Sequence, residues 1–363
     1  MNRSPTIRDV AKRAGVAVST ASLALNGKPY VSRETRFKVL QAAEELGYHP
    51  HTLAKNLADG RTRTIGLINP ITIEHLFSSS GFFMLLIQGI HQAAGEYDYS
   101  VFLIISETEE EALERMRKAL QQRSVDGLVI TNPSLASPYL RLLEGRHVPH
   151  VFVGRPPQGN ALYVDNDNVE IGRLGTQHLI ELGHRRIVFL SGPARFTHCQ
   201  DRLLGYQAAL RDAGIEFSEE LVWYVEQSEE AVCQAVREKG PRHRFSAICA
   251  TSGIHAVGAV RALKELGFAV PEDVAVACVE DTELTRYFIP PLTAVDLHSY
   301  WLGYWAAKLL IRSIQGEDPG RPILIPGELV VRASSGVGSP GKGVKAGIEP
   351  MRPTENPESE GGV

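Results

Sequence analysis

Short apolar runs alternate with amphipathic stretches from Thr64 to about Arg332, and this alternation limits the possible folds more than any other feature of the sequence. The stretches between the runs, such as LERMRKALQQ and RLLGYQAALRDAG, have the period of helices. A strand followed by a helix, many times over, predicts a parallel sheet covered by helices. The predicted strands are TIGLI, SVFLII, DGLVI, HVFVG, RIVFL, LVWYV, SAICA and VAVACV.

The number of these units favours two sheets side by side over a single sheet. The length of the chain agrees, because 363 residues exceed one typical hydrophobic core and predict two or three compact units. Ligands of such sheets bind at the carboxyl ends of the strands, so we expect a ligand in the cleft between two α/β lobes. After about Arg332 the sequence is rich in Gly, Pro, Ser and Glu, which predicts a disordered tail.

Several classes of protein are not expected from the composition and the motifs. A hydrophobic content of 43% and a charged content of 22% are those of a soluble globular protein. The longest apolar runs are too short to span a membrane, and the N-terminus lacks the apolar core of a secretory signal, so the cytoplasm is the expected compartment. The four cysteines form no C-x-x-C pair, which predicts neither a disulfide framework nor a metal site. We find no G-x-S-x-G elbow, and no helix pattern follows the G-x-G-x-x-G of the tail, so we expect no enzymatic activity and no cofactor.

Positive charge is concentrated at the start of the chain. Residues 1–63 hold eleven Lys and Arg against five Asp and Glu, whereas the whole chain has a net charge of −4. A basic head on an acidic body is typical of a nucleic-acid-binding module joined to another domain.

Three short helices are predicted in this basic head. The first, IRDVAKRA, follows Thr6 as its N-cap and ends at Gly15. The second covers residues 18–25, and the turn residues NGKP stop it. The third begins after Ser32 and ends at Gly47, with apolar positions at Phe37, Leu40, Ala43 and Leu46. The segment HPHTLAKNLADGRT predicts at most a turn or two of helix in a polar connector.

Two short helices that a turn separates and a third helix braces are typical of a helix-turn-helix, whose second helix enters the major groove. The period of the second helix directs Val16, Ala21 and Leu25 toward the other helices. It directs Val18, Ser19, Ser22 and Leu23 toward solvent or DNA. A small helical bundle without a role in nucleic-acid binding has the same periodicity, and the local positive charge favours DNA binding.

The segment TIRDVAKRAGVAVSTASLALNGKPYVSRETRFKVLQAAEELGYHPHTLAKNLADGRTRTIGLI resembles, without gaps, the N-terminal signature of the LacI/GalR family of bacterial transcription regulators. The resemblance continues through VDND, HLIELGHRRIVFLSGP, DRLLGYQAAL, EDTE, IPPLTAV and ELVVRAS, and so covers Thr6 to about Ser334. It implies an all-α helix-turn-helix domain joined to a two-lobed α/β effector domain of the type I periplasmic-binding-protein fold. The domains it implies are residues 1–50 for DNA binding, 51–62 for a hinge helix and linker, 63–333 for effector binding and dimerisation, and 334–363 for the tail.

The resemblance implies a homodimer on a near-palindromic double-stranded DNA operator. The hinge would insert Leu57 into the minor groove, although Leu57 could instead pack against its dimer mate. This sequence departs from the family at position 23, where Arg or His is common, and at Ala17, where Ser is common; Val18 and Leu23 could therefore contact thymine methyl groups. The predicted DNA-binding residues are Thr6, Val18, Ser19, Thr20, Ser22, Leu23, Asn26, Tyr48 and Leu57, of which Thr20, Ser22 and Asn26 would contact phosphates or cap helices.

For the body, the resemblance implies a small effector such as a sugar or a related metabolite. Arg202 matches an Arg that reaches ligand hydroxyls, and Glu280 matches an acidic ligand contact; a salt bridge or a loop brace is the alternative for both. Trp223 could stack on a sugar or lie in the core. Ser252 and Gly253 stand where the family often has Asn-Asp. The predicted effector-binding residues are Arg202, Glu280, Trp223, Ser252, Phe82 and Arg155, with Phe77 and Ser79 in the same reshaped segment as Phe82.

The function that follows is a ligand-responsive transcription regulator, expected to be a repressor, in which the effector changes the separation of two hinge segments. Both an inducer and a corepressor are compatible with the sequence. The alternative is a sugar-binding receptor without DNA function. That alternative predicts a signal peptide and no basic helical head, and the sequence has the opposite features.

Overall fold

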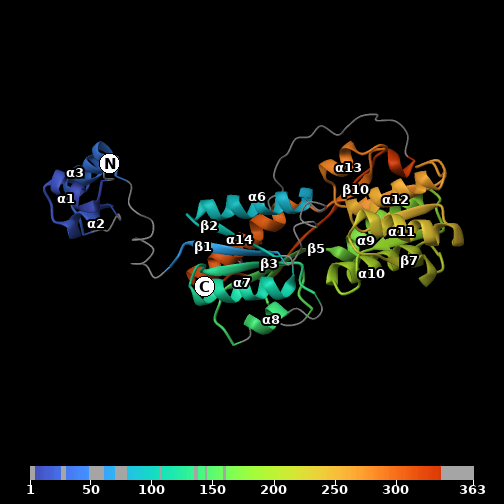
Figure 1. Ribbon diagram of the computed structural model, residues 1–363, viewed down its shortest axis with the longest axis horizontal. Helices are drawn as coiled ribbons and strands as arrows, with labels where there is room; N and C mark the ends of the chain where they lie inside the picture. The colour runs from blue at the N-terminus through green and yellow to red at the C-terminus, as the bar shows by residue number, and fades with distance from the viewer. Residues whose placement is uncertain are drawn as a thin grey trace, which may run out of the picture. The chain divides into compact units, whose positions relative to one another are not determined.

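A computed structural model describes most of the chain (Figure 1). The described residues are 5–25, 30–48, 61–69, 80–106, 108–134, 138–143, 145–157 and 161–336. Contacts between residues divide the chain into two compact units, one of Met1–Ile171, Gly192–Leu204 and Leu297–Gly327 and the other of Gly172–Ser191, Gly205–Asp296 and Glu328–Val363. We describe the helical domain (5–48), the first lobe (61–171, 192–204 and 297–327) and the second lobe (172–191, 205–296 and 328–336) each by itself.

The helical domain contains the three predicted helices, α1 (Ile7–Ala14), α2 (Val18–Leu25) and α3 (Arg33–Leu46). Asp9 and Thr6 form a capping box at the start of α1, in which the carboxylate of Asp9 accepts both the backbone N–H and the hydroxyl of Thr6 at 2.8 and 2.7 Å. Gly15 and Gly47 end α1 and α3 in the left-handed conformation, with φ of 68° and 63°. The buried centre consists of Val10, Ala11, Ala21, Ala24, Val39, Ala42, Ala43 and Tyr48.

Two of the four apolar residues named in the third predicted helix are exposed in α3. Phe37 is 68% exposed and Leu40 49% exposed, whereas Ala43 is buried and Leu46 half-buried. The face of α3 that packs on α1 and α2 runs through Val39, Ala42 and Ala43. The apolar residues of α3 therefore do not all lie on its buried face.

The first lobe is a parallel sheet in the order β11-β5-β4-β3-β1-β2, with helices on both faces. Alternate residues of each strand face opposite sides, so Ile65 and Leu67 contact α6 and α14 while Ile68 packs on the side of α7 and α8 (Figure 1). Both faces are therefore buried, as is usual for parallel sheets. The elements are β1 (Thr64–Asn69), α6 (Ser80–Glu96), β2 (Ser100–Ile105), α7 (Glu109–Gln121), β3 (Gly127–Thr131), α8 (Pro138–Leu143), β4 (His150–Val153), β5 (Tyr163–Asn166), α14 (Ser299–Gln315) and β11 (Ile323–Ile325).

The second lobe has the same plan, with the sheet order β12-β10-β9-β8-β6-β7. All its strand pairs are parallel except β10 with β12, which is antiparallel. Helices α11 and α12 bury one face, and α9 and α10 cover the other, where Tyr206 donates to the backbone O of Ile187 at 2.9 Å (Figure 1). The elements are α9 (Asn168–Glu181), β6 (Ile187–Ser191), α10 (Thr197–Asp212), β7 (Val222–Tyr224), α11 (Glu229–Lys239), β8 (Ala247–Ala250), α12 (Gly253–Glu265), β9 (Ala275–Val279), α13 (Glu283–Tyr287), β10 (Thr293–Asp296), β12 (Glu328–Val330) and the 3-10 turn η3 (Ala333–Ser335).

All eight predicted strands are present, and the prediction of two sheets is confirmed. Strands β5, β10, β11 and β12 were not predicted. The predicted start of the tail at residue 334 is wrong, because Ser334 and Ser335 are buried. Ser334 also donates to the backbone O of Val276 at 2.6 Å, which ties η3 to the second lobe. The rest of the predicted tail, from 337, lies outside the described residues, as do Asn26, Leu57, Phe77 and Ser79.

Candidate DNA-binding and effector-binding sites

Helix α2 presents two apolar side chains to solvent. Val18 is 43% exposed and Leu23 39% exposed, and Ser19 is exposed as well. The other side of α2 is fixed, because Ala21 and Ala24 are buried in the centre of the helical domain. Residues 20 and 22 are half-buried between these two sides. The residues predicted to contact bases are therefore on the outside of a packed three-helix domain.

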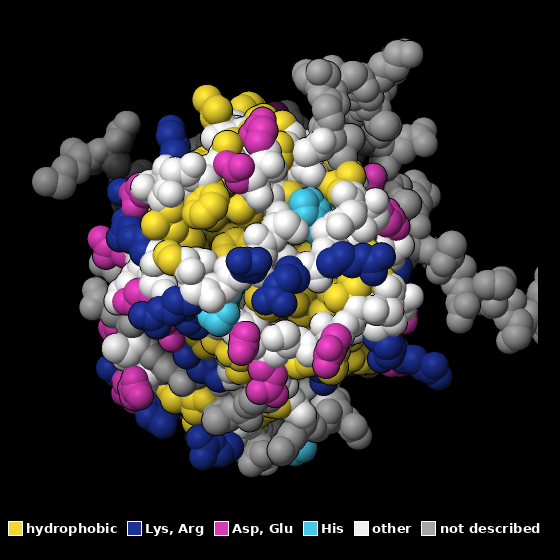
Figure 2. Space-filling model, turned by 90° about the vertical axis from the view of Figure 1, so that its right-hand side faces the viewer, with side chains coloured by type: hydrophobic (Ala, Val, Ile, Leu, Met, Phe, Trp, Pro, Cys, Tyr) yellow, Lys and Arg dark blue, Asp and Glu magenta, His cyan; other side chains and the backbone are white. Residues whose placement is uncertain are grey.

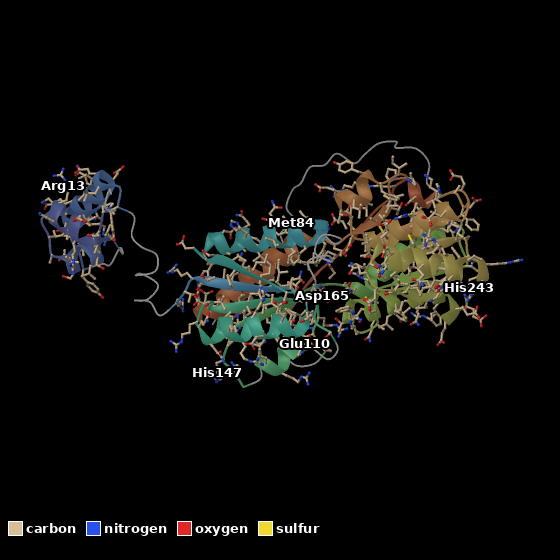
Figure 3. All side chains as sticks on the ribbon, viewed as in Figure 1. Arg13, Met84, Glu110, His147, Asp165 and His243 are labelled. Carbon is tan, nitrogen blue, oxygen red and sulfur yellow. The ribbon has the colours of Figure 1, made fainter. Side chains whose placement is uncertain are left out.

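A series of buried polar side chains begins at Asp165, which Figure 3 labels, at the carboxyl end of β5 in the first lobe. Arg202, on α10, donates from Nε to Oδ1 of Asn168 at 2.9 Å. Asn168 in turn donates from Nδ2 to Oδ1 of Asp165 at 3.0 Å. These two bonds fix the orientation of the guanidinium of Arg202, and a fixed guanidinium is suited to reading the hydroxyls of a ligand.

Asp165 anchors this series to the backbone. Its carboxylate accepts the N–H groups of Arg155 and Asn166, both at 2.8 Å. Burial raises the pKa of Asp165 above its usual value, although the hydrogen bonds and the charge of Arg202 act in the opposite direction.

In the second lobe, Ser252 and Glu280 meet at the first turn of α12. Ser252 is the N-cap, and its hydroxyl accepts the N–H of His255 at 3.3 Å. Glu280 follows β9 in the left-handed conformation, with φ of 77°, and its Oε2 accepts the N–H of Gly253 at 3.2 Å. Both side chains lie at the carboxyl ends of their strands, β8 and β9, where ligands of parallel sheets bind.

Two family models match the chain. The model of bacterial regulatory proteins of the lacI family matches residues 6–51, and that of the periplasmic binding protein-like domain matches residues 176–335. Among curated relatives, the HTH-type transcriptional regulator CelR of Thermobifida fusca is 36% identical over 338 residues, which cover 92% of this chain and 98% of the relative. The chain belongs to the LacI family of bacterial regulatory proteins. It is therefore a DNA-binding, effector-modulated transcriptional regulator, and members of the LacI family are not enzymes.

Solved structures of LacI-family proteins agree over the whole architecture. The structure of a CelR–cellobiose complex has 34% sequence identity and a TM-score of 0.72, and it covers 92% of this chain and 100% of its own. The lac repressor dimer bound to operator and the anti-inducer ONPF has 28% identity and a TM-score of 0.79, with 92% and 99% covered. The fold class predicted from the sequence is confirmed.

One predicted effector contact of this LacI-family regulator is wrong. Trp223, on β7, is 1% exposed and packs in the core with residues of α11, and Phe245 meets it edge to face with ring centroids 5.6 Å apart. Its indole N–H donates to the backbone O of Glu220 at 2.8 Å. The ring has no free face for a sugar, so Trp223 is a core residue.

The other predicted site residues keep their assignments as predictions. Tyr48 lies in the core of the helical domain with 9% of its surface exposed, and Phe82 is half-buried against the core under α6 and α14. Arg155 forms an ion pair with Asp201, in which Nη2 is 2.7 Å from both carboxylate oxygens. Thr6 is the N-cap of α1, as predicted, and its contact with DNA stays a prediction.

Sequence reasoning missed an aromatic pair near Arg202. Phe196 and His198 stack with ring centroids 5.6 Å apart and an interplanar angle of 19°. Burial, followed by the charge of Arg202, lowers the pKa of His198 to about 3, so this ring is neutral at physiological pH. The aromatic residues spaced two apart just before DRLLGY were the available signal.

Sequence reasoning also missed a buried aspartate next to Glu280 that is paired with two arginines. Asp281 is buried and forms ion pairs with Arg332 at 2.8 Å and Arg286 at 3.0 Å. Burial alone would raise the pKa of Asp281, but the hydrogen bonds from the two guanidinium groups lower it. Over the described part of the chain, His, Cys, Asp and Glu form no group that could hold a metal ion, and no helix is long and apolar enough to cross a membrane.

Proposed function

We propose that this protein is a homodimeric repressor that binds a near-palindromic operator and whose affinity for that operator depends on a sugar. The observation that carries the proposal is the exposure of Val18 and Leu23 on α2. Two apolar side chains on the outer side of a short helix gain free energy only when a surface covers them. Thymine methyl groups in the major groove supply such a surface, and Ser19 adds a hydrogen-bonding group beside them.

The hinge and the remaining DNA contacts complete this proposal. Residues 1–50 bind the major groove, and residues 51–62 form the hinge, with Leu57 as the wedge between base pairs. Thr20, Ser22 and Asn26 contact phosphates or cap helices, and Thr6 and Tyr48 stay in the proposed DNA-binding set. The effector and dimerisation domain follows from residue 63.

Carbohydrate hydroxyls match the polar groups at the ends of the strands. Arg202 donates to hydroxyl oxygens in the first lobe, and Glu280 accepts from hydroxyl groups in the second, with Ser252 beside it. The CelR relative has been solved with cellobiose, which supports a saccharide as the class of effector. Phe82 and Arg155 stay in the proposed effector set.

The dimer is supported by exposed apolar side chains on each lobe. In the first lobe, Met84 and Leu85 of α6 are exposed, as are Phe102 and Leu103 of the edge strand β2, which contacts α6; Figure 3 labels Met84. In the second lobe, Tyr287 and Ile289 are more than four-fifths exposed. Apolar groups of this kind mark protein interfaces. A regulator that occupies operator DNA works where the chromosome is, so we expect the protein in the cytoplasm.

Effector and operator binding are coupled in this proposal. The sugar changes the fraction of dimers whose two hinge segments have the spacing that the operator requires. Each ligand must then change the affinity for the other by the same factor.

The test begins with selection of bound sequences from randomised duplex DNA. We expect a near-palindromic consensus, an affinity that falls steeply as salt rises, and a change of that affinity when cellobiose or another saccharide is added. Leu57→Ala should weaken operator binding and leave saccharide binding intact. A protein that selects no consensus but still binds saccharides would instead be a sugar receptor, and the repressor proposal would be wrong.

A further inference from the structure

Four arginines lie at the end of the second lobe where the inner strands β6 and β8 begin. We call Arg185, Arg186, Arg242 and Arg244 the basic edge. Arg185 and Arg186 directly precede β6, and Arg242 and Arg244 stand within five residues before the neighbouring strand β8; the two strands pair from Ile187 and Ala247 onward. All four residues are exposed. His243, in the middle of this sequence stretch, lies at the end of the second lobe in Figure 3, and Figure 2 faces that end and shows Lys and Arg gathered in a band.

The arginines of the basic edge have no carboxylate partner within ion-pair distance among the described residues. Arg185 donates to the backbone O of Ala213 at 3.2 Å, and Arg186 donates to the backbone O of Arg244. Elsewhere on the same lobe, exposed arginines are paired: Arg237 with Glu265 and Arg261 with Glu229, at 2.6 and 2.7 Å. None of the four arginines is thus paired with a carboxylate of its own lobe, although Glu220 lies 3.8 Å from His243 in the same stretch.

The last described residue leaves the second lobe from the same edge. An ideal Cβ on Gly336 would lie 3.8 Å from Cβ of Pro271, which precedes the start of β9. Ser334, two residues earlier, donates to the backbone O of Val276 near the start of that strand. Strands β9, β8 and β6 are consecutive neighbours in the sheet, so the starts of β9 and β6 are about 10 Å apart.

Acidic residues follow further along the chain. Residues 355–360 read ENPESE, with three glutamates and no Lys or Arg. We propose that this acidic segment binds the basic edge of the second lobe of its own chain. Residues 337–354, as a coil, have a root-mean-square reach of about 24 Å, which exceeds the distance to be covered.

Tethering favours this occupant over an external acidic protein. A segment joined by a short linker is present at an effective concentration in the millimolar range, well above that of most cellular partners. Carboxylates also match guanidinium groups in bidentate geometry. Bound in this way, the segment neutralises arginines that would otherwise attract DNA without sequence preference.

The experiment uses full-length chains and a labelled peptide of residues 350–363. In the wild-type protein the segment already occupies the basic edge, so the peptide should bind weakly by fluorescence anisotropy. In the full-length variant Glu355→Gln/Glu358→Gln/Glu360→Gln the edge is vacant, and the peptide should bind at least about tenfold more tightly, with an affinity that falls as salt rises.

Adding Arg242→Glu and Arg244→Glu to the triple variant should abolish peptide binding. These two side chains make no hydrogen bond within the described residues, and Arg242→Gln/Arg244→Gln is a milder version should the reversed charges impair folding. The matched control reverses Arg115 and Arg117 on α7 of the first lobe and should leave peptide binding unchanged. Equal binding to the wild-type and triple-variant chains, or binding that survives both substitutions at the basic edge, overturns the proposal. If Arg242→Glu/Arg244→Glu lowers the affinity of the chain for non-operator DNA but leaves peptide binding unchanged, the occupant is nucleic acid and the proposal is also overturned.

Discussion

Substitution of Gly89 by Ala should strongly destabilise the first lobe. Helices α6 and α14 cross so closely that a Cβ on Gly89 would lie 1.9 Å from the backbone O of Tyr300, and one on Gly303 would lie 2.0 Å from that of Leu86. Because both clashes are with backbone atoms, no side-chain rotation relieves them. The helices would have to separate by about 1.5 Å to restore an ordinary contact in a close-packed core.

The expected loss follows from two opposing effects. Overpacking of this severity costs about 3 kcal/mol, at the upper end of its usual range. Replacing a helical Gly by Ala returns about 1 kcal/mol, which leaves a net loss of about 2 kcal/mol in the free energy of unfolding. Gly95 is the matched control, because it lies on the same helix and no heavy atom is within 4 Å of its ideal Cβ. Gly95→Ala should therefore stabilise the lobe by roughly 0.5–1 kcal/mol.

Urea unfolding followed by tryptophan fluorescence measures this difference. Two of the three tryptophans of the chain, Trp301 and Trp305, are on α14, so the signal reports mainly on the first lobe. The two variants should shift the unfolding midpoint in opposite directions. If Gly89→Ala unfolds within about 0.5 kcal/mol of the wild type, a difference typical of harmless surface changes, the close crossing of the helices is refuted.

Three further predictions concern the DNA surface and the buried charges. Leu23→Ala should weaken the binding free energy by about 1 kcal/mol per half-site, which for the two half-sites of a dimer raises the operator Kd about 30-fold. Phe37→Ala on α3 should leave the Kd, measured by fluorescence anisotropy, within about twofold of the wild-type value. Asp281→Asn should lower the free energy of unfolding at pH 7 by about 3 kcal/mol. The pKa of Asp281 is lowered on folding, so its stabilisation is present above about pH 4 and is lost as pH falls below that value. Between about pH 7 and about pH 3 the variant should therefore lose less stability than the wild type. Because the pKa of His198 is lowered to about 3, only the unfolded chain gains a proton at this residue as pH falls below about 6.5. Between pH 7.5 and 5.5 the wild type should therefore lose about 1.4 kcal/mol more stability in urea titrations than His198→Gln, and an identical pH dependence would contradict the lowered pKa.

Most of the fold could be predicted because its signals are local. Helix α2 matches its predicted residues 18–25, since turn residues stand on both sides of it. The missed strands β11 and β12 are three residues long, and β5 and β10 end in polar residues, YVDN and TAVD. A pattern of apolar runs does not predict strands that are this short or that end in polar residues.

The site could be predicted only in part, because its contacts join distant positions. Arg202 and Glu280 were found by resemblance, but their partners Asn168 and Gly253 are 34 and 27 residues away along the chain. Trp223 shows the opposite error. A tryptophan at a strand end is equally compatible with a core and with a ligand platform, and only the packing of Phe245 and α11 on it decides the matter.

Glu280 supplies the carboxylate beside Ser252 and Gly253, which stand where the family often has Asn-Asp. An ideal Cβ on Gly253 would lie 3.1 Å from Cγ2 of Thr285 and 3.9 Å from Oε2 of Glu280, so the carboxylate of Glu280 occupies the space beside residue 253. The left-handed backbone of Glu280 costs about 1–2 kcal/mol. Two hydrogen bonds offset that cost: the N–H of Glu280 donates to the backbone O of Val295 at 3.0 Å, and its Oε2 accepts the N–H of Gly253 at 3.2 Å. The acid that helix α12 needs at its first turn thus comes from the neighbouring strand. That same carboxylate is the proposed hydroxyl acceptor, so effector binding and the capping of α12 compete for its oxygens. A substitution of Glu280 should therefore change both effector binding and the stability of the first turn of α12.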